Sequence, residues 1–383
     1  MSRLEELTQR YCPDGVEYKA LKDLLKIKNG RDYKHLGSGL IPVYGSGGIM
    51  TYVDTSMYDK PSVLIPRKGS IDKLYYVDTP FWNVDTVFYT EINTSLVKEK
   101  YVFYVLQKEH LEKLNTAGGV PSLTQAVLNE VVIPIPPMPV QEEIVRILDS
   151  FTELQAELQA ELQKRKQQYN YYRDNLLSFS GRPDVKICEL GEIGTFIRGN
   201  GLQKKDFTES GVGCIHYGQI YTRFGAFADK TLTYVDENLA SRLLQVEKGN
   251  LVIACTSENV EDICKCVAWL GDETICTGGH ACVFRHRQNP KYISYFFQTE
   301  FFYNQKVKYT YGTKVKDIKP DSLAKIQIPL PALQEQERIV SILDNLYALT
   351  NDLTTGLPAE IEKRRQQYEY YRDRLLSFKR IDA

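Results

Sequence analysis

The sequence lacks any long hydrophobic run and any excess of one charge sign. No apolar stretch approaches the roughly 20 residues that cross a membrane, and residues 1–10 are polar, so we expect no transmembrane helix and no signal peptide. The formal net charge is −1, with 48 basic and 49 acidic side chains. A chain that coats nucleic acid without regard to sequence would need a basic excess to neutralise phosphates. That class is excluded, whereas a sequence-specific reader is not.

The sequence also lacks the common motifs of catalysis and metal binding. It contains neither a G-x-x-x-x-G-K-[ST] nucleotide loop nor a G-x-S-x-G elbow, and its five histidines are scattered. Among eight cysteines only Cys264 and Cys266 are close, and the C-x2-C spacing of zinc sites is absent. We therefore expect no catalytic centre, metal or cofactor on this chain. Unpaired thiols favour a cytoplasmic protein with reduced cysteines.

An internal repeat is the main feature of what is present. The segment Lys164–Phe179 returns as Lys363–Phe378, with 13 of 16 aligned positions identical. Upstream, seven positions in Gln141–Asp149 match Gln336–Asp344. The intervening segments, from about 11 to 135 and from 182 to 330, share little sequence. The chain therefore consists of two variable segments, each followed by one copy of the same constant segment.

Both constant segments are predicted to be long helices. Apolar residues recur in steps of three and four through 144–179 and 339–378, which is a heptad seam with stutters. Each helix would span about 40 residues, or roughly 60 Å. Neither seam can remain exposed to water, so we expect the two helices to pack together as an antiparallel coiled coil. In the second copy, Gly356-Leu-Pro358 predicts a kink or a restart with the proline in a first turn.

The first constant segment contains the tetrapeptide ELQA twice, at Glu153–Ala160. Four helical residues add about 6 Å and turn the helix about 40° past a full turn. The number of units would therefore set the separation and twist of whatever lies at the helix ends. The alternative is a scar of repeat slippage without consequence.

The repeat extends beyond the seam to positions that helix pairing alone does not require. Matching outer positions indicate two equivalent docking surfaces for two copies of one partner. The residues that we assign to docking are Gln168, Tyr171, Arg173, Asp174, Gln367, Tyr370, Arg372 and Asp373.

The variable segments predict two mixed β domains. Short apolar runs alternate with glycine turns, for example at Ile41–Tyr44, Ser62–Ile65, Gly213–Tyr217 and Cys264–Leu270. The predicted class is therefore α+β, with a pseudo-two-fold internal repeat. The predicted domains are 1–139, a central helix at 140–180, a second domain at 181–333 and a C-terminal helix at 334–379.

Loops of both domains carry residues suited to bases and phosphates. Arginine, lysine, asparagine and glutamine reach base edges, and glycine allows close backbone approach. Each loop alone is more typical of a solvated turn. In the first domain the candidates are Tyr44, Ser46, Gly47, Arg67, Lys68, Ser70 and Trp82. In the second they are Arg198, Lys204, Lys205, His216, Tyr217, Gln219, Tyr221, Arg223, Ser257 and Lys314.

Over nearly its whole length the chain resembles the specificity subunits of type I restriction–modification systems. The motifs that carry the resemblance are C-P-D-G-V-E-Y (12–18), I-P-V-Y-G-S-G-G (41–48), I-P-I-P-P (133–137), the repeated K-R-K-Q-Q-Y-N-Y-Y-R-D-N-L-L-S-F and G-L-P-A-E-I-E-K-R-R-Q-Q-Y (356–368). The last is specific to that family, whereas each motif inside the variable domains is weak evidence.

The resemblance implies a non-catalytic subunit with two target-recognition domains, each reading half of a bipartite site in double-stranded DNA. The helices would act as a spacer and as a platform for two modification (methyltransferase) subunits. Restriction subunits, which are ATP-dependent translocases and nucleases, would join the full complex. The S-adenosylmethionine and ATP chemistry would belong to these partners, and no membrane is implied.

Two rival interpretations stay open. One is a self-contained enzyme such as a nuclease or methyltransferase, which the missing motifs oppose. The other is a scaffold that binds only protein.

Overall fold

The computed structural model describes residues 2–115, 118–179, 182, 185–351 and 356–381. The chain forms two compact units: unit 1 is Met1–Leu158 with Ile361–Ala383, and unit 2 is Gln159–Glu360. Each unit combines one β-rich domain with parts of both constant segments, so the predicted α+β class is confirmed. The predicted boundary between 180 and 181 lies outside the described residues, and the other domain boundaries stay predictions.

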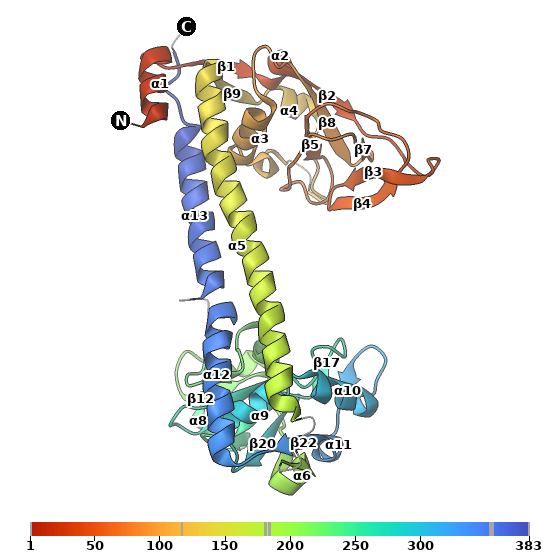
Figure 1. Ribbon diagram of the computed structural model, residues 1–383, viewed down its shortest axis with the longest axis vertical. Helices are drawn as coiled ribbons and strands as arrows, with labels where there is room; N and C mark the ends of the chain where they lie inside the picture. The colour runs from red at the N-terminus through yellow and green to blue at the C-terminus, as the bar shows by residue number, and fades with distance from the viewer. Residues whose placement is uncertain (1, 116–117, 180–181, 183–184, 352–355, 382–383) are drawn as a thin grey trace. The chain divides into compact units, whose positions relative to one another are not determined.

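The domain of unit 1 contains a four-stranded sheet in the order β2-β8-β5-β6, a three-stranded sheet β4-β3-β7 and the pair β1-β9 (Figure 1). Every residue of β5 is buried, as expected for an apolar run in the interior of a sheet. Its elements are α1 (Arg3–Tyr11), β1 (Glu17–Ala20), α2 (Leu21–Leu24), β2 (Leu25–Asn29), β3 (Ser38–Gly45), β4 (Gly48–Val53), β5 (Ser62–Pro66), β6 (Tyr75–Val77), β7 (Trp82–Asn83), β8 (Val87–Ile92), α3 (Glu99–Lys108), a 3-10 turn (Leu111–Leu114), α4 (Gln125–Asn129) and β9 (Val132–Ile135).

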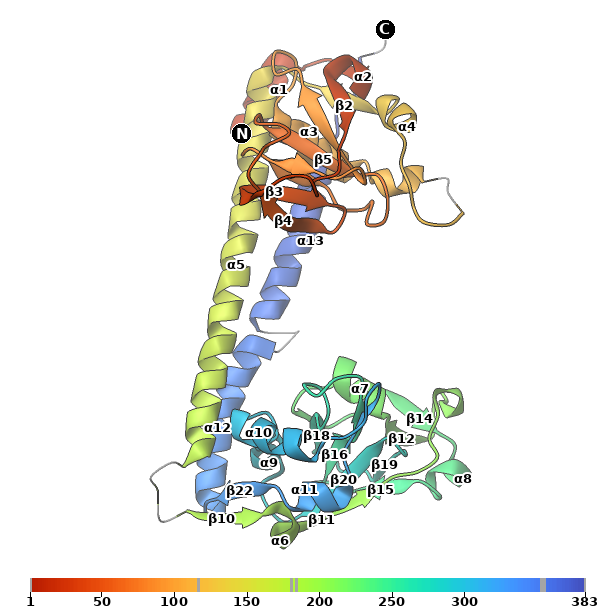
Figure 2. The same ribbon diagram turned by 90° about the vertical axis from the view of Figure 1, so that its right-hand side faces the viewer.

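The domain of unit 2 is larger, with a five-stranded sheet β11-β20-β16-β18-β13, a four-stranded sheet β14-β12-β19-β15 and the pairs β10-β22 and β17-β21 (Figure 2). Its elements are β10 (Lys186–Glu189), α6 (Leu190–Ile193), β11 (Gly194–Arg198), a 3-10 turn (Lys204–Asp206), β12 (Val212–Ile215), α7 (Tyr217–Thr222), β13 (Phe227–Ala228), β14 (Thr233–Val235), α8 (Glu237–Ala240), β15 (Leu244–Val246), β16 (Leu251–Ala254), β17 (Thr256–Ser257), β18 (Cys266–Trp269), β19 (Ile275–Thr277), β20 (Ala281–His286), α9 (Pro290–Phe296), α10 (Glu300–Tyr309), β21 (Lys316–Asp317), α11 (Pro320–Ala324) and β22 (Gln327–Leu330). The predicted strands lie within or beside these elements. Tyr217, which was predicted to end a strand, instead begins helix α7.

Both domains enter their constant helix in the same way. β1 pairs antiparallel with β9, and β10 pairs in the same manner with β22. A proline-containing stretch follows each closing strand. A buried glutamine in the first turns of the constant helix donates a hydrogen bond to a proline carbonyl of that stretch. Gln141 Nε2 donates to Pro136 O at 2.8 Å, and Gln336 Nε2 donates to Pro331 O at 2.9 Å. The internal repeat therefore includes contacts as well as sequence.

The first constant segment forms one helix, α5 (Met138–Ser178), whose 41 residues match the predicted length. The second forms two helices, α12 (Leu333–Asn351) and α13 (Leu357–Leu375). Pro358 lies in the first turn of α13, which confirms the predicted restart.

The helices pack in antiparallel pairs within each unit. In unit 1, the start of α5 shares a core with the end of α13, and Phe151 stacks on Tyr371 with ring centroids 5.5 Å apart. In unit 2, the end of α5 shares a core with the start of α12, and Tyr169 meets Tyr347 edge-on at 5.9 Å. The predicted antiparallel packing is confirmed, and the β-rich domains join the same cores.

A polar clamp fixes the domain of unit 1 to both helices. Asp149 of α5 accepts hydrogen bonds from Tyr104 Oη at 2.6 Å and from Lys100 Nζ at 2.9 Å. Tyr368 Oη of α13 donates to Gln107 Oε1 at 2.8 Å. Burial and the bond to Asp149 raise the pKa of Tyr104, so its hydroxyl stays a donor.

An equivalent clamp occurs in unit 2. Asp344 of α12 accepts from Tyr295 Oη at 2.6 Å and from Lys291 Nζ at 2.7 Å. Tyr169 Oη of α5 donates to Gln298 Oε1 at 3.2 Å. Each domain thus contacts one helix through an aspartate and the other through a tyrosine.

We predict that Asp344→Ala loosens α9 from α12, because it leaves the buried Tyr295 hydroxyl without an acceptor. Such a loss costs about 2 kcal/mol. Hydrogen exchange should rise along α9 while unit 1 stays unchanged, and Asp149→Ala should act in the same way on α3 alone. Asp272→Ala removes only an exposed ion pair with Lys248 and serves as the control. The account of the clamps fails if Asp344→Ala and Asp272→Ala give the same exchange.

Candidate nucleic-acid interface and helix surfaces

In unit 1, two turns that carry predicted DNA-contacting residues lie side by side. Ser46 and Gly47 form the β3–β4 turn, and Tyr44 lies just before it in β3. Tyr75 Oη donates to Ser46 O at 3.0 Å, and a side chain at Gly69 would meet Ser46 Oγ at 3.3 Å. The loop after β5, which contains the other predicted residues, therefore touches this turn.

Within that loop Lys68 is exposed, while Arg67 and Ser70 are half-buried. The Arg67 guanidinium lies over the Phe88 ring at 5.1 Å, and its Nη1 is 3.5 Å from Asn29 Oδ1. Its buried Nε has no protein partner. Arg67 is therefore only loosely held and keeps hydrogen-bond donors for a ligand.

The structure contradicts the prediction that Trp82 faces a ligand. The side chain is buried, and its Nε1 donates to Arg31 O at 2.9 Å. Trp82 packs with Val43 and Val53 in a small core beneath the β3–β4 hairpin. Its role is to support the hairpin, because its single donor is already used.

Arg198 is likewise engaged inside unit 2. Its Nη1 and Nη2 donate to the two carboxylate oxygens of Asp317 at 2.8 and 2.7 Å, and its Nε donates to Gly279 O at 3.3 Å. Burial alone would raise the pKa of Asp317, but the hydrogen bonds from Arg198 hold it below its ordinary value. Arg198 thus ties the loop Tyr311–Asp317 to the end of β11, and its predicted contact with DNA stays a prediction.

A hollow of about 390 Å³ gathers several predicted residues of unit 2 with others that were not predicted. Tyr217 and Ser257 line it together with His280, whose ring centroid lies 4.8 Å from that of Tyr217. Tyr221 also lines it, and burial raises the pKa of that phenol. Glu258 and Asp262 also contribute to the lining, and the Tyr221 hydroxyl donates to Thr256 O. The aromatic faces beside the imidazole are suited to stack on nucleobases.

Two other predicted residues are used within the chain. His216 is buried and accepts from Gly218 N at 3.2 Å, which caps the start of α7. Burial, with a smaller effect of Lys204, lowers the pKa of His216 and keeps the ring neutral. The amide of Gln219 bonds to His216 N and to Thr233 Oγ1. The buried His216 is therefore not placed to reach a ligand, which corrects its prediction, whereas the half-buried Gln219 stays a prediction.

The remaining predicted cations of unit 2 are exposed. Lys204 and Lys205 lie on a 3-10 turn, Arg223 follows the end of α7, and Lys314 lies in the loop after α10. Their contact with DNA stays a prediction.

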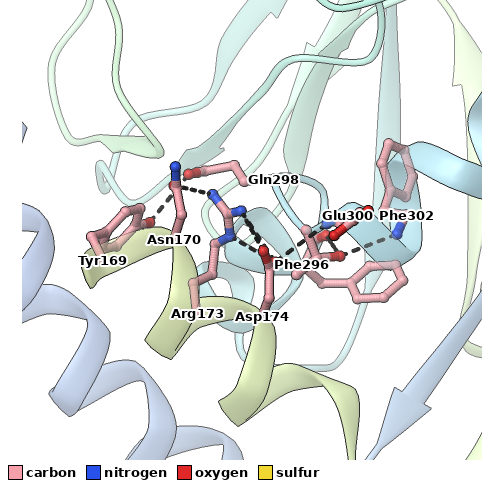
Figure 3. A network of polar contacts seen from close by, with 9 residues as sticks. Tyr169, Asn170, Arg173, Asp174, Phe296, Gln298, Glu300 and Phe302 are labelled. Atoms are coloured by element: carbon pink, nitrogen blue, oxygen red, sulfur yellow. Dashed lines mark hydrogen bonds and ion pairs between the residues drawn. The ribbon is translucent and has the colours of Figure 1, made fainter. Parts of the chain in front are cut away.

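The helix positions predicted for docking separate into two groups. Arg173 and Arg372 are each 8% exposed, whereas Tyr171 is 67% and Tyr370 is 60% exposed. Figure 3 shows Arg173 pairing with Asp174, which in turn accepts from Glu300 N at the start of α10. The prediction that Arg173 and Asp174 face outward is therefore wrong, because the domain of unit 2 packs over that side of α5.

The second copy repeats this division within unit 1. Arg372 pairs with Asp373 at 2.8 Å and lies over the Tyr368 ring at 5.8 Å, so it too is turned inward. Asp373 itself is exposed. Gln168 and Gln367 are half-buried, and each accepts at 2.9 Å from an arginine one turn earlier. The tyrosines at 171 and 370 are thus the most exposed of the matched docking residues.

The clamps are the functional residues that the sequence prediction missed. The pattern Lys-Tyr-x-x-Tyr-x-x-Gln occurs at 100–107 and again at 291–298, inside segments that otherwise differ. Tyr101 and Tyr292 in this pattern donate to Pro134 O and Pro329 O. A search for short spaced repeats within the predicted helices would have found it.

The described residues carry no group of three or more His, Cys, Asp or Glu side chains placed to hold a metal ion. Within the same part of the chain, no helix has both the length and the apolar character of a membrane span.

Comparison with known proteins identifies the family. Residues 13–165 and 183–363 each match the type I restriction modification DNA specificity domain. The chain belongs to the type I restriction–modification specificity family. A Haemophilus influenzae protein named as a type I restriction enzyme specificity subunit is 30% identical over 394 residues, covering 95% of this chain and 96% of that protein.

Two further relatives agree with this assignment. The EcoR124I/EcoR124II specificity subunit of Escherichia coli is 34% identical over 291 residues, covering 73% of this chain and 70% of that protein. The crystal structure of a type I S subunit from M. genitalium shares the fold, with a TM-score of 0.56 at 15% identity, covering 95% of this chain and 97% of that one. The chain is thus a specificity subunit with DNA-recognition domains and not a catalytic subunit.

We predict that Asp317→Ala weakens DNA binding as much as Arg198→Ala does. If the pair positions the loop Tyr311–Asp317, either loss releases it, at a cost of about 2 kcal/mol, and amide exchange in the loop rises. Exchange and DNA affinity of the full-length subunit in its complex would measure both effects.

The two single variants separate positioning from direct contact. If Arg198 contacted DNA itself, Asp317→Ala would free its guanidinium and leave affinity equal or higher. Lys248→Ala, which removes an exposed ion pair of unit 2, is the control.

Proposed function

We propose that each domain reads one half of a bipartite, asymmetric site in double-stranded DNA. The observation that carries this is the combination of two equivalent polar clamps with two dissimilar sets of loops. The clamps attach both domains to the helices by the same chemistry, while the loops differ in length and side chains. Two different readers mounted in the same way favour two different half-sites, read in the major groove.

The proposed domains follow the predicted ranges 1–139 and 181–333. Because the repeat is joined through antiparallel helices, the two readers would approach the duplex in inverted orientation, as in dimeric DNA-binding proteins. Helix length would then determine the unread gap between the half-sites.

We further propose that Tyr171 and Tyr370 form the centres of two equivalent surfaces, each docking one modification (methyltransferase) subunit. Their exposure in both copies supports this, because a large exposed aromatic side chain at a repeated helix position is typical of an interface anchor. Restriction subunits would join this assembly in the cytoplasm. The methyl-transfer and ATP-dependent steps would then belong to the partners.

The chain assembled with its modification subunits should select one bipartite sequence from a pool of random DNA. We expect two unlike specified tracts at a fixed separation. Deleting one ELQA unit, Glu157–Ala160, should bring them about two base pairs closer, because four helical residues span about 6 Å and one base pair about 3.4 Å. Sequencing of the retained DNA measures both the tracts and the gap.

The control is Gln155→Ala, which changes the same repeat without changing helix length. An unchanged gap after the deletion would count against the spacer role and favour a slippage scar. Selection of no sequence would favour a protein-binding scaffold. Cleavage or methylation of DNA by the purified chain alone would favour a self-contained enzyme.

Alanine at both Tyr171 and Tyr370 should abolish co-purification of the methyltransferase subunits. Loss of a buried aromatic anchor costs 2 kcal/mol or more, which is about 30-fold or more in affinity at each site. A single substitution should leave one bound copy, as measured by native mass spectrometry.

Tyr52→Ala, which removes an exposed tyrosine of β4, is the matched control and should leave both copies bound. An intact complex from the double variant would refute the docking assignment.

A further inference from the structure

Two exposed valines occupy equivalent places in the two domains. Val120 is 70% exposed and Val315 is 58% exposed. They lie 195 positions apart, the same separation as Gln141 from Gln336 and Asp149 from Asp344. Their neighbours differ: Gly119 and Pro121 flank the first, whereas Lys314 and Lys316 flank the second. Valine is therefore retained where the residues on either side are not.

Backbone hydrogen bonds fix the segment that directly follows the valine of unit 1. Ser122 forms a β-bridge with Lys68, and Leu123 N donates to Arg67 O at 2.9 Å. Gly69 N donates to Pro121 O at 3.2 Å. The backbone beside Val120 is thus tied to the loop that carries the predicted DNA contacts Arg67 and Lys68.

The valine of unit 2 is held by the same pattern. Asp317 and Lys316 pair with β17, and Ile318 N donates to Cys255 O at 3.2 Å. The Arg198–Asp317 ion pair adds a side-chain anchor at this point. Both valines therefore precede a short backbone pairing with the end of a central strand, so their positions are fixed within each domain.

Polar groups and charges of both signs surround the valine of unit 2. Lys314 is exposed and Lys316 half-buried on either side of it. Val315 also lines the 390 Å³ hollow beside His280 and the carboxylates of Glu258 and Asp262. Asp262 is paired with Lys265 at 2.7 Å. An isolated apolar side chain in such surroundings does not form the extended apolar patch that a protein partner covers.

The exposed Lys68 and Lys314 lie near the two valines and favour a polyanion, and the exposed valines favour one that carries single methyl groups among hydrogen-bonding edges. In the major groove, thymine alone among the four bases presents a C5-methyl group beside an acceptor oxygen. We propose that Val120 and Val315 each cover one thymine methyl group, one in each half-site, and so select thymine at that position. This inference rests on the proposed function and deepens it.

The test replaces each thymine of the selected sequence by deoxyuridine, which removes only the methyl group. At one position in each half-site, binding by the complete complex should weaken about 4-fold, the value of one buried methyl group. Val315→Ala should weaken binding by a similar factor and abolish the uracil effect at its own position alone. Val120→Ala should do the same in the other half-site.

The matched controls are Val307→Ala on α10 and Val127→Ala on α4, both exposed valines of the same two domains. They should leave affinity and the uracil effects unchanged. The inference is overturned if no uracil substitution weakens binding, if a half-site contains no thymine, or if the uracil effects persist in the valine variants. A complex that selects no sequence would instead refute the proposed function.

Discussion

The arrangement of each unit depends on a carboxylate near the start of a constant helix that accepts a tyrosine hydroxyl and a lysine ammonium from the adjoining domain. Asp149 does this for Tyr104 and Lys100, and Asp344 does it for Tyr295 and Lys291. A charged acceptor strengthens both bonds, and partial burial reduces competition from water. The same contact geometry therefore recurs on two otherwise dissimilar domains.

The loops show how the same helix attachment accommodates two domains with different loop side chains. Asn29 and Arg198 each end the strand that opens the core sheet of their domain. Asn29 contacts Arg67 and Gln125, whereas Arg198 is bound by Asp317. The backbone plan is shared, but the polar pair that steadies the loop differs. The loop side chains can therefore differ while the attachment to the helices stays the same.

Much of the architecture could be predicted from the sequence because it rests on periodicity. The heptad seam predicted α5 and its antiparallel packing, and Gly356 with Pro358 predicted the restart at α13. The strands followed from apolar runs between glycine turns. The proline-containing stretch before each constant helix could be recognised in the sequence, because proline restricts the backbone dihedral φ.

The candidate site was predicted less well, because side-chain burial depends on what packs against each face. Arg173 was assigned to an outer surface since the seam accounts only for helix–helix contact, yet the domain of unit 2 covers it. Trp82 and His216 have the right chemistry for DNA, but the fold uses their polar atoms internally. Ser46 and Lys68 lie in loops, and Tyr217 and Ser257 line a hollow, while Tyr44 belongs to β3 and packs against Phe81. Contact of these residues with DNA stays a prediction.

Long-read sequencing of methylated bases in cells that carry this subunit with its modification partners tests the central claim most directly. The account predicts a single modified motif made of two unlike specified tracts that are separated by a constant unspecified gap. A continuous motif, a palindromic motif or a methylation pattern unaffected by loss of the subunit would contradict it.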